Sequence, residues 1–384
     1  MSQNSPVVIS IGYGRHMFVL ENGERARMQI CAEETAGLHM VVFTSKSDGL
    51  QTQKVSDKLY LYPTNSKSKF HMVWDAFQIA AKIMKTVDKN NRLIVTTQDP
   101  FEAGLVGYFL KKKFGIWLTI QEHADVFTLD FWRKESVLNQ IRYKLGEYLL
   151  KQADVIRVVS KRIEMTLAKK TLTARITNLP VAIDIISFVK KNLEDDFSVK
   201  KSEEFWLLSV ARFVPQKNFP LMIATFVEAY RKNPRLRLKI VGQGPEYKKI
   251  ETEILREFKD TFETCPIVIE KWSDDVSGLM WQADAYLLTS NYEGWARVLI
   301  ESLICELPIV TTSVGCADEV VLNEQHGLVV PVNDREALSE AMLRISTDEV
   351  FYKQIKANLK ALPKHLIAGS DMANYGKNWI TTLE

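Results

Sequence analysis

The chain has 384 residues, of which 46% are hydrophobic and 25% are charged, and its formal net charge is +3. These values are ordinary for folded globular proteins, so disordered and fibrous classes are excluded. A chain of this length exceeds one compact core of ordinary size and predicts two domains of about 150–200 residues each.

The charge is unevenly distributed between the two halves of the chain. Residues 1–200 contain 29 Lys and Arg against 21 Asp and Glu, whereas residues 201–384 contain 21 against 26. The basic first half predicts contact with an anionic partner, either a membrane surface or a phosphate-bearing acceptor. No nucleic-acid-binding module accompanies it. Since neither a spanning apolar run nor a signal peptide is evident, we expect a cytoplasmic protein.

Strand and helix patterns alternate along the whole chain, which is typical of parallel α/β sheets. The strands expected in the first half are residues 6–12, 39–44, 59–63, 93–98, 116–122, 155–160 and 176–179. Those expected in the second half are residues 205–211, 236–242, 267–272, 285–290, 309–313 and 327–331. We therefore predict two doubly wound domains, residues 1–198 and 199–363, with a boundary in the polar segment 190–204 and a C-terminal helix, about residues 364–384, that returns to the first domain.

The turn IGYGRHMF follows the first expected strand and carries Gly12 and Gly14. Glycine permits positive φ and close backbone approach, so both residues are candidates for contact with a donor phosphate. A nicotinamide-binding turn would read G-x-G-x-x-G, but Met17 occupies the third position and no acidic residue ends the second strand. These departures disfavour a dehydrogenase.

His123 lies just beyond the expected strand 116–122, in the sequence EHAD. Ligands of open α/β sheets bind beyond the carboxyl ends of the strands, which makes His123 a candidate for transition-state stabilisation or for orienting an acceptor. A structural, hydrogen-bonded histidine is the alternative interpretation.

Residues 131–151 are predicted to form one amphipathic helix. Its apolar face would carry Leu138, Ile141, Leu145 and Leu149, and Arg133, Lys134, Arg142 and Lys144 would surround it. Core packing is the default interpretation of such a face. The alternative, favoured by the basic first half, is that the helix rests on anionic lipid headgroups.

Two cations follow the first expected strand of the second half, Arg212 at its end and Lys217 five residues later. Arginine offers a planar fork for phosphate oxygens and lysine a compact charge, so the pair suits a nucleoside diphosphate without a metal. Solvated surface charge is the alternative for either residue.

Two glutamates with the spacing E-x7-E follow the expected strand 285–290. Glu293 precedes a predicted helix that Gly294–Arg297 open, and Glu301 lies within that helix. The free amides at a helix start attract a phosphate or a sugar hydroxyl, and a carboxylate can accept hydrogen bonds from two neighbouring hydroxyls.

The combined order of these motifs resembles the glycosyltransferases of family 4. The order is Arg-x4-Lys, KIVGQGPE, E-x7-E, LPIVTTSVGCADEVV and HGLVVP, and the likeness is strongest from about residue 205 to 338. The resemblance implies the GT-B fold, with two Rossmann-like domains facing across a cleft, and a retaining transfer without a metal. It implies that Arg212 and Lys217 bind the donor diphosphate, that Glu293 contacts the transferred sugar, and that Glu301 holds the ribose.

Further donor contacts implied by the resemblance are Gly244, the residues Gly294, Trp295, Ala296 and Arg297, and Trp272 against the base. Trp272 is also compatible with a core position. The expected partners are a nucleotide sugar, a carbohydrate or lipid-linked acceptor and an anionic membrane at the inner face. No cofactor or metal is expected, and no D-x-D pair of aspartates is present. A sugar-nucleotide epimerase and a non-catalytic sugar-binding protein remain the alternative functions.

Overall fold

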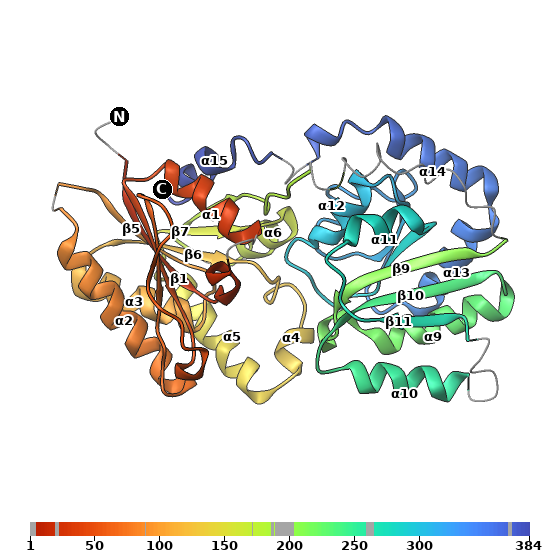
Figure 1. Ribbon diagram of the computed structural model, residues 1–384, viewed down its shortest axis with the longest axis horizontal. Coiled ribbons are helices and arrows are strands. Elements are labelled where there is room, and N and C mark those ends of the chain that lie inside the picture. Colours follow the sequence, from red (N-terminus) through yellow and green to blue (C-terminus); the bar gives the residue numbers. More distant parts are fainter. Residues whose placement is uncertain are drawn as a thin grey trace. The chain divides into compact units, whose positions relative to one another are not determined.

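The computed structural model describes residues 5–19, 23–88, 90–170, 172–185, 188, 203–258, 265–367 and 371–384. The chain divides into two compact units, Met1–Ala182 with Asp371–Glu384, and Ile183–Ser370 (Figure 1). The predicted division between residues 198 and 199 lies outside the described residues.

Unit 1 is built on an eight-stranded sheet with the order β3-β4-β2-β1-β5-β6-β7-β8. Its strands are β1 (Val7–Gly12), β2 (Gly37–Val42), β3 (Gln53–Lys54), β4 (Leu59–Pro63), β5 (Leu93–Thr97), β6 (Trp117–Glu122), β7 (Val155–Val158) and β8 (Arg175–Asn178). All neighbours pair in parallel except β3 with β4. The order reverses at β1: the strands β2 to β4 are added on one side of it, and the strands β5 to β8 on the other.

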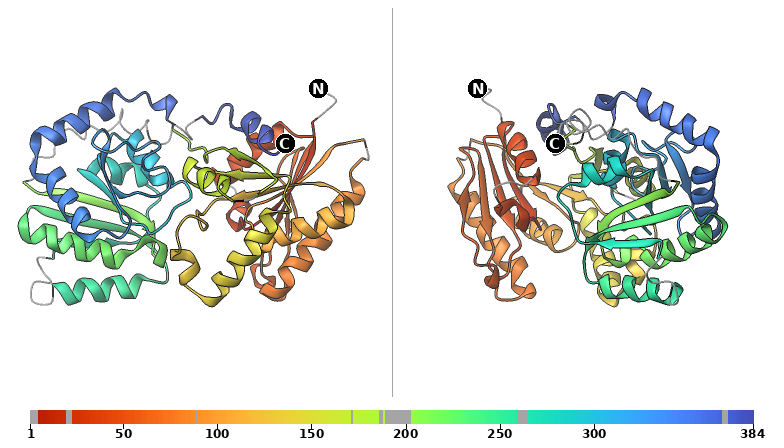
Figure 2. Two further views of the ribbon diagram at one scale, coloured as in Figure 1. Left: turned by 180° about the vertical axis from the view of Figure 1, so that it is seen from behind. Right: turned by 45° about the vertical axis from the view of Figure 1, so that its right-hand side comes forward.

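Helices cover both faces of this sheet (Figure 2). They are α1 (Gly23–Glu33), α2 (Lys69–Thr86), α3 (Glu102–Phe114), α4 (Phe131–Lys134), α5 (Val137–Leu150), α6 (Lys161–Ala168) and α15 (Tyr375–Thr381). The helices α2 and α3 pack side by side on one face, and α15 packs on α1. The single helix predicted over residues 131–151 is wrong, because Ser136 caps a new helix by accepting a hydrogen bond from the Asn139 amide.

The predicted return of the C-terminal helix to the first domain is confirmed. Tyr375 and Trp379 are buried in the same core as Met28 and Cys31. A Cβ atom on Gly376 would stand 2.6 Å from the Ile30 carbonyl oxygen, so only glycine allows α15 to approach α1 this closely.

Unit 2 has a six-stranded parallel sheet with the order β11-β10-β9-β12-β13-β14. Its strands are β9 (Phe205–Arg212), β10 (Leu236–Gln243), β11 (Ile267–Glu270), β12 (Ala285–Leu288), β13 (Ile309–Thr312) and β14 (Gly327–Val330). Its helices are α9 (Phe219–Lys232), α10 (Tyr247–Glu257), α11 (Val276–Gln282), α12 (Arg297–Ile304), α13 (Arg335–Thr347) and α14 (Glu349–Ala361). Here the order reverses at β9, between β10 and β12.

Both sheets therefore have the doubly wound topology predicted from the alternation of strands and helices. Each has a point at which the strand order reverses, and ligands of such sheets bind beyond the carboxyl ends of the strands there. The two-residue strand β3 was missed, because QK carries no apolar alternation. No helix in the described ranges is long and apolar enough to cross a bilayer.

Candidate active site

At the reversal point of the second sheet, the side chain of Tyr286 on β12 bridges to the backbone of β9. The strands β9 and β12 pair only at Ala285 with Leu207 and at Tyr286 with Leu208. Beyond this register the Tyr286 hydroxyl donates to the Val210 carbonyl oxygen at 2.9 Å and accepts from the Val210 amide at 3.2 Å. The Tyr286 side chain is fully buried, and the hydrogen bonds of its hydroxyl take the place of backbone pairing between the two strands. Burial raises the pKa of this hydroxyl. The loops that follow β9 and β12 come together beyond this point, where Lys217 contacts Glu293.

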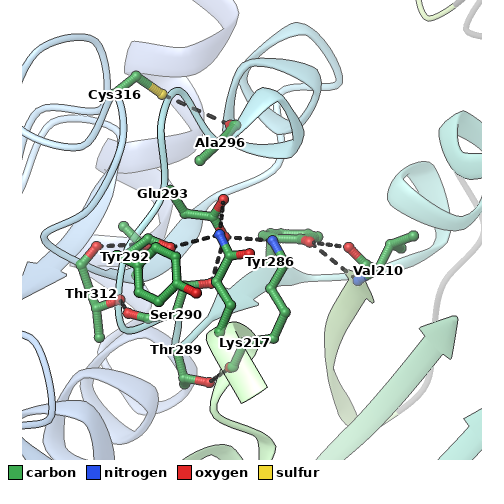
Figure 3. A network of polar contacts seen from close by, with 12 residues as sticks. Val210, Lys217, Tyr286, Thr289, Ser290, Tyr292, Glu293, Ala296, Thr312 and Cys316 are labelled. Atoms are coloured by element: carbon green, nitrogen blue, oxygen red, sulfur yellow. Dashed lines mark hydrogen bonds and ion pairs between the residues drawn. The ribbon is translucent and has the colours of Figure 1, made fainter. Parts of the chain in front are cut away.

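Lys217 and Glu293 meet at this point. Figure 3 shows the ammonium directed at the carboxylate, and the Lys217 Nζ to Glu293 Oε1 distance is 2.5 Å. Both side chains are nearly enclosed, with exposed fractions of 12% and 9%. Lys217 ends the short 3-10 helix η3 (Pro215–Lys217) after β9, and Glu293 follows β12. The structure therefore joins two residues that the sequence placed 76 positions apart.

Three neighbours hold this ion pair in place. Ser290 donates to Glu293 Oε1 at 2.7 Å, and the Gln216 side-chain amide donates to Glu293 Oε2 at 3.1 Å. Thr289 fixes the other partner, because its hydroxyl donates to the Lys217 carbonyl oxygen at 3.1 Å. Sequence reasoning missed all three, since isolated Ser, Thr and Gln residues carry no pattern that distinguishes them from ordinary loop residues.

Arg212 stands at the end of β9, opposite Gln243 in the sheet register. It is exposed and forms no ion pair with any described residue. Gly244 lies against the same loop, since a Cβ atom on it would stand 2.4 Å from the Phe213 carbonyl oxygen, and its φ is +154°. A free guanidinium and a glycine loop therefore lie beside one another at the carboxyl end of β9.

The predicted helix start at Gly294–Arg297 is corrected by the structure. The helix α12 begins at Arg297, and Ala296 is the N-cap with a left-handed φ of 59°. Gly294 and Trp295 belong to the preceding turn, and both are buried. No side chain caps this helix. The Leu299 amide donates to the Ala296 carbonyl oxygen at 2.9 Å, which leaves the amides of Arg297 and Val298 to a ligand or to water.

Glu301 lies one helical turn after Arg297, and its carboxylate is 3.6 Å from the Arg297 guanidinium. Burial raises the pKa of Glu301, and Arg297 opposes that shift. Trp272 lies beyond the end of β11 with 45% of its surface exposed, and its indole donates to Asp274. It is therefore a loop residue, and the core interpretation is wrong.

Unit 1 places His123 after β6, as expected. The Gln121 side-chain oxygen accepts from the Arg157 guanidinium at 2.5 Å and lies 2.8 Å from His123 Nε2. Because Arg157 can only donate, this oxygen is an acceptor, so His123 Nε2 carries the proton. Burial and the charges of Arg157 and Arg27 lower the pKa of His123 to about 3. The ring is neutral at physiological pH, with Nδ1 as an acceptor.

Gly12 and Gly14 have another reason to be glycine than the one predicted. Neither has a positive φ, and that of Gly14 is −170°. A Cβ atom on Gly12 would lie 2.5 Å from the Gln98 Cβ. Gly12, at the end of β1, therefore leaves room for Gln98 in the loop after β5.

Comparison with known proteins identifies the class of enzyme. Residues 190–361 match the family of glycosyl transferases group 1. An uncharacterized glycosyltransferase of Methanocaldococcus jannaschii is 28% identical over 290 residues, 74% of each chain. The N-acetyl-alpha-D-glucosaminyl L-malate synthase of Bacillus anthracis is 22% identical over 329 residues, 83% of this chain and 82% of its own. The chain is therefore a glycosyltransferase.

A solved structure supports the fold. Anabaena HepE, in complex with UDP and glucose, superposes with a TM-score of 0.70 at 14% identity, over 98% of this chain and 99% of its own. The two doubly wound sheets thus have the GT-B fold.

The enclosed ion pair gives a prediction on stability. Lys217→Ala leaves the Glu293 carboxylate without its cation, and we expect the free energy of unfolding of unit 2 to fall by about 3 kcal/mol. Arg212→Ala, a control at an exposed cation without an ion pair, is expected to change it by less than about 0.5 kcal/mol. Urea denaturation measures both. Equal effects of the two variants would show that the pair contributes nothing specific.

Proposed function

We propose that the protein is a retaining glycosyltransferase of family 4 that moves a sugar from a nucleoside diphosphate sugar to a hydroxyl acceptor. The observation that carries the proposal is the contact between Lys217 and Glu293 at the reversal point of the second sheet. A diphosphate needs cations and a sugar needs hydrogen-bond acceptors, and this pair supplies both within 2.5 Å. UDP-sugars are the first donors to test, because HepE was solved with UDP.

The donor would be held along the carboxyl edge of the second sheet. Arg212 and Lys217 bind the diphosphate, and the arrival of phosphate oxygens releases Glu293 from Lys217 to accept hydrogen bonds from the sugar. Glu301 accepts from the ribose hydroxyls, and the amides of the turn from Gly294 to Arg297, just before α12, meet the β-phosphate. Trp272 stacks on the base with its exposed face, and Gly244 lets the diphosphate approach β9.

Transfer would follow a front-side displacement. The bond from the anomeric carbon to the diphosphate oxygen breaks, and the electron pair leaves with the diphosphate. The acceptor oxygen bonds to the same face of the carbon, and its proton passes to the departing phosphate oxygen. Arg212 and Lys217 stabilise the charge that develops there. The neutral His123 orients the acceptor, and Gly12 and Gly14 give the donor access to the first loop.

The roles of Lys217 and Glu293 predict large losses of turnover. Lys217→Ala removes the cation on the leaving group and Glu293→Ala removes the sugar's acceptor, so each should lower kcat by about two decades or more. Chromatography of products from UDP-glucose and related donors measures this. Lys248→Ala, at an exposed lysine on α10, is the charge-matched control. Near-normal rates in Lys217→Ala would contradict the assignment, and epimerised nucleotide sugar as the product would favour the epimerase.

Metal independence remains a prediction. If the arginine and lysine neutralise the diphosphate alone, turnover in excess EDTA should stay within about twofold of the untreated rate. Activity that disappears in EDTA and returns with Mg²⁺ or Mn²⁺ would show instead that a cation carries the leaving group.

The proposed acceptor is a carbohydrate or a lipid-linked saccharide. The surface of α5 supports the proposal that the enzyme binds the cytoplasmic face of a membrane, where a lipid-linked acceptor would lie. Of the predicted apolar face, Leu149 is buried, but Leu138 and Ile141 are 54% and 60% exposed. The core interpretation is therefore wrong for these two residues. With Val137 and Tyr148, 71% and 49% exposed, they form an apolar strip that we call the α5 strip.

The charges around the α5 strip fit an anionic bilayer. Arg142 is paired with Glu102 at 2.5 Å, and Arg133 with Asp130 at 2.8 Å. Lys144 and Lys151, by contrast, are exposed and form no ion pair within the described ranges. Apolar side chains flanked by unpaired lysines are the pattern of an interfacial helix.

The α5 strip predicts binding to anionic vesicles. Ile141→Asp places a charge in the strip and should reduce the fraction that sediments with phosphatidylglycerol vesicles about tenfold, because a carboxylate resists entry into the headgroup boundary. Val350→Asp is the matched control, since Val350 is 79% exposed on α14 of unit 2. Equal sedimentation of the wild type with neutral and anionic vesicles would remove the membrane proposal.

A further inference from the structure

A cavity of about 300 Å³ lies within unit 1 at the reversal point of the first sheet. It is formed by the ends of β1, β5, β6 and β7 and is bounded by α1 and α15. Its volume fits a small ligand or the end group of a larger one. The residues that define its polar character are Glu24, Arg27, Asp99, Gln121, His123 and Arg157.

Arg157 is the unusual member of this group. It is 2% exposed, although it lies in the apolar strand β7, and it is among the largest fully buried side chains. Its guanidinium donates to Gln121 at 2.5 Å, and to the Leu179 carbonyl oxygen and the Tyr375 hydroxyl at 3.0 Å. All three acceptors are neutral, and Nε has no hydrogen-bond partner among the residues that the structure describes. A buried cation without a counter-ion is costly, so a ligand anion here would be bound strongly.

A second cation lines the same part of the cavity. Arg27, on α1, forms no hydrogen bond or ion pair with a described residue. Arg27, Arg157 and His123 line this cavity together, and the charges of the two arginines contribute to lowering the pKa of His123. His123 adds no charge, because its ring is neutral. Arg27, Arg157, Gln121 and His123 therefore form a donor-rich, positively charged end, which we call the arginine end.

The lining of the cavity also contains two acidic residues, Asp99 and Glu24. Burial raises the pKa of Asp99 to about 6, and the charges that modify it are Glu102 and Arg142 rather than the two arginines. Asp99 Oδ1 accepts hydrogen bonds from the amides of Phe101 and Ala103 at 2.8 and 3.2 Å, which hold this carboxylate in the loop after β5. Glu24, on α1, completes the lining. The cavity thus holds carboxylates as well as cations, and the arginine end is defined by its hydrogen-bond donors.

We propose that the arginine end binds an anionic group of the acceptor, a carboxylate or a phosphate, and so selects acceptors that carry one. The inference rests on the proposed function, since it names the acceptor class of that transfer. Arginine is suited to the role, because its planar fork donates two parallel hydrogen bonds to either anion. Arg157 provides the buried anchor, and Arg27 closes on the anion from α1.

The test uses the full chain and two simple probes, inorganic phosphate and succinate, at constant ionic strength set with NaCl. Calorimetric titration should show saturable binding of at least one, and the tighter probe identifies the source of the anion. Arg27→Ala should weaken that binding at least about tenfold, the range expected for a charge-assisted hydrogen bond. Lys82→Ala, at an exposed lysine on α2, removes the same charge outside the cavity and should leave binding unchanged.

A parallel titration with UDP separates this inference from the proposed function. Lys217→Ala should abolish UDP binding and leave the phosphate or succinate titration intact, whereas Arg27→Ala should leave UDP binding intact. Absence of UDP binding by the wild type would count against the donor site alone. The anion inference is overturned if neither probe saturates, if Arg27→Ala binds as well as wild type, or if Arg27→Ala weakens UDP as much as the probe. Arg157→Lys, which keeps the charge, should bind the probe more weakly than wild type because the bidentate fork is lost.

Discussion

The geometry of unit 2 depends on one enclosed ion pair. Lys217 and Glu293 come from loops after different strands, and their contact fixes both loops over the Tyr286 hydroxyl (Figure 3). Ser290 and Gln216 saturate the carboxylate, so the pair costs less to bury than two isolated charges would. The same atoms are those that a diphosphate and a sugar require. In the proposed donor complex, the ligand would exchange partners with a pair that is already in place, without having to order the loops first.

The reversal points of the two sheets differ in the partners of their buried cations. At the reversal point of the second sheet, a cation faces a carboxylate, and each compensates the other. At the reversal point of the first sheet, the hydrogen bonds of the buried Arg157 go to neutral acceptors, the side chains of Gln121 and Tyr375 and a backbone carbonyl oxygen. Burial of polar groups in a fold is normally accompanied by satisfied partners. Arg157 Nε departs from this rule, since it has no partner in the described part of the chain, and the anionic acceptor group proposed above would supply one.

Much of the fold was predictable because strand ends carry the informative residues. Arg212, Lys217, Glu293 and His123 all follow strands that the apolar pattern identified, and parallel strands bring their carboxyl ends to one edge. What the pattern could not provide was local backbone geometry. Ala296 adopts a left-handed conformation that delays α12 until Arg297, and nothing in the letters GWAR signals that turn. The break between α4 and α5 did have a signal, the serine cap before Asn139, but the strong amphipathic pattern across it obscured the cap.

Arg157 shows what sequence reasoning missed in unit 1. A single arginine within the strand VIRV is a visible anomaly, since buried parallel strands are normally apolar throughout. Its significance depends on residues that lie far away in the chain. Tyr375 comes 218 positions later, and its hydroxyl contributes one of the three neutral acceptors. Only the tertiary structure shows that the hydrogen-bond acceptors of Arg157 are all neutral.

The close approach of Gly376 to Ile30 has a consequence for biosynthesis. The sheet of unit 1 comes from the first part of the chain, but Tyr375 and Trp379, which help enclose its cavity, are translated after all of unit 2. Domains generally begin to fold as they emerge from the ribosome, so most of unit 1 must wait with the α1 surface uncovered while unit 2 is made. Unit 1 is thus begun before unit 2 and finished after it, and its cavity is assembled only once α15 has been made.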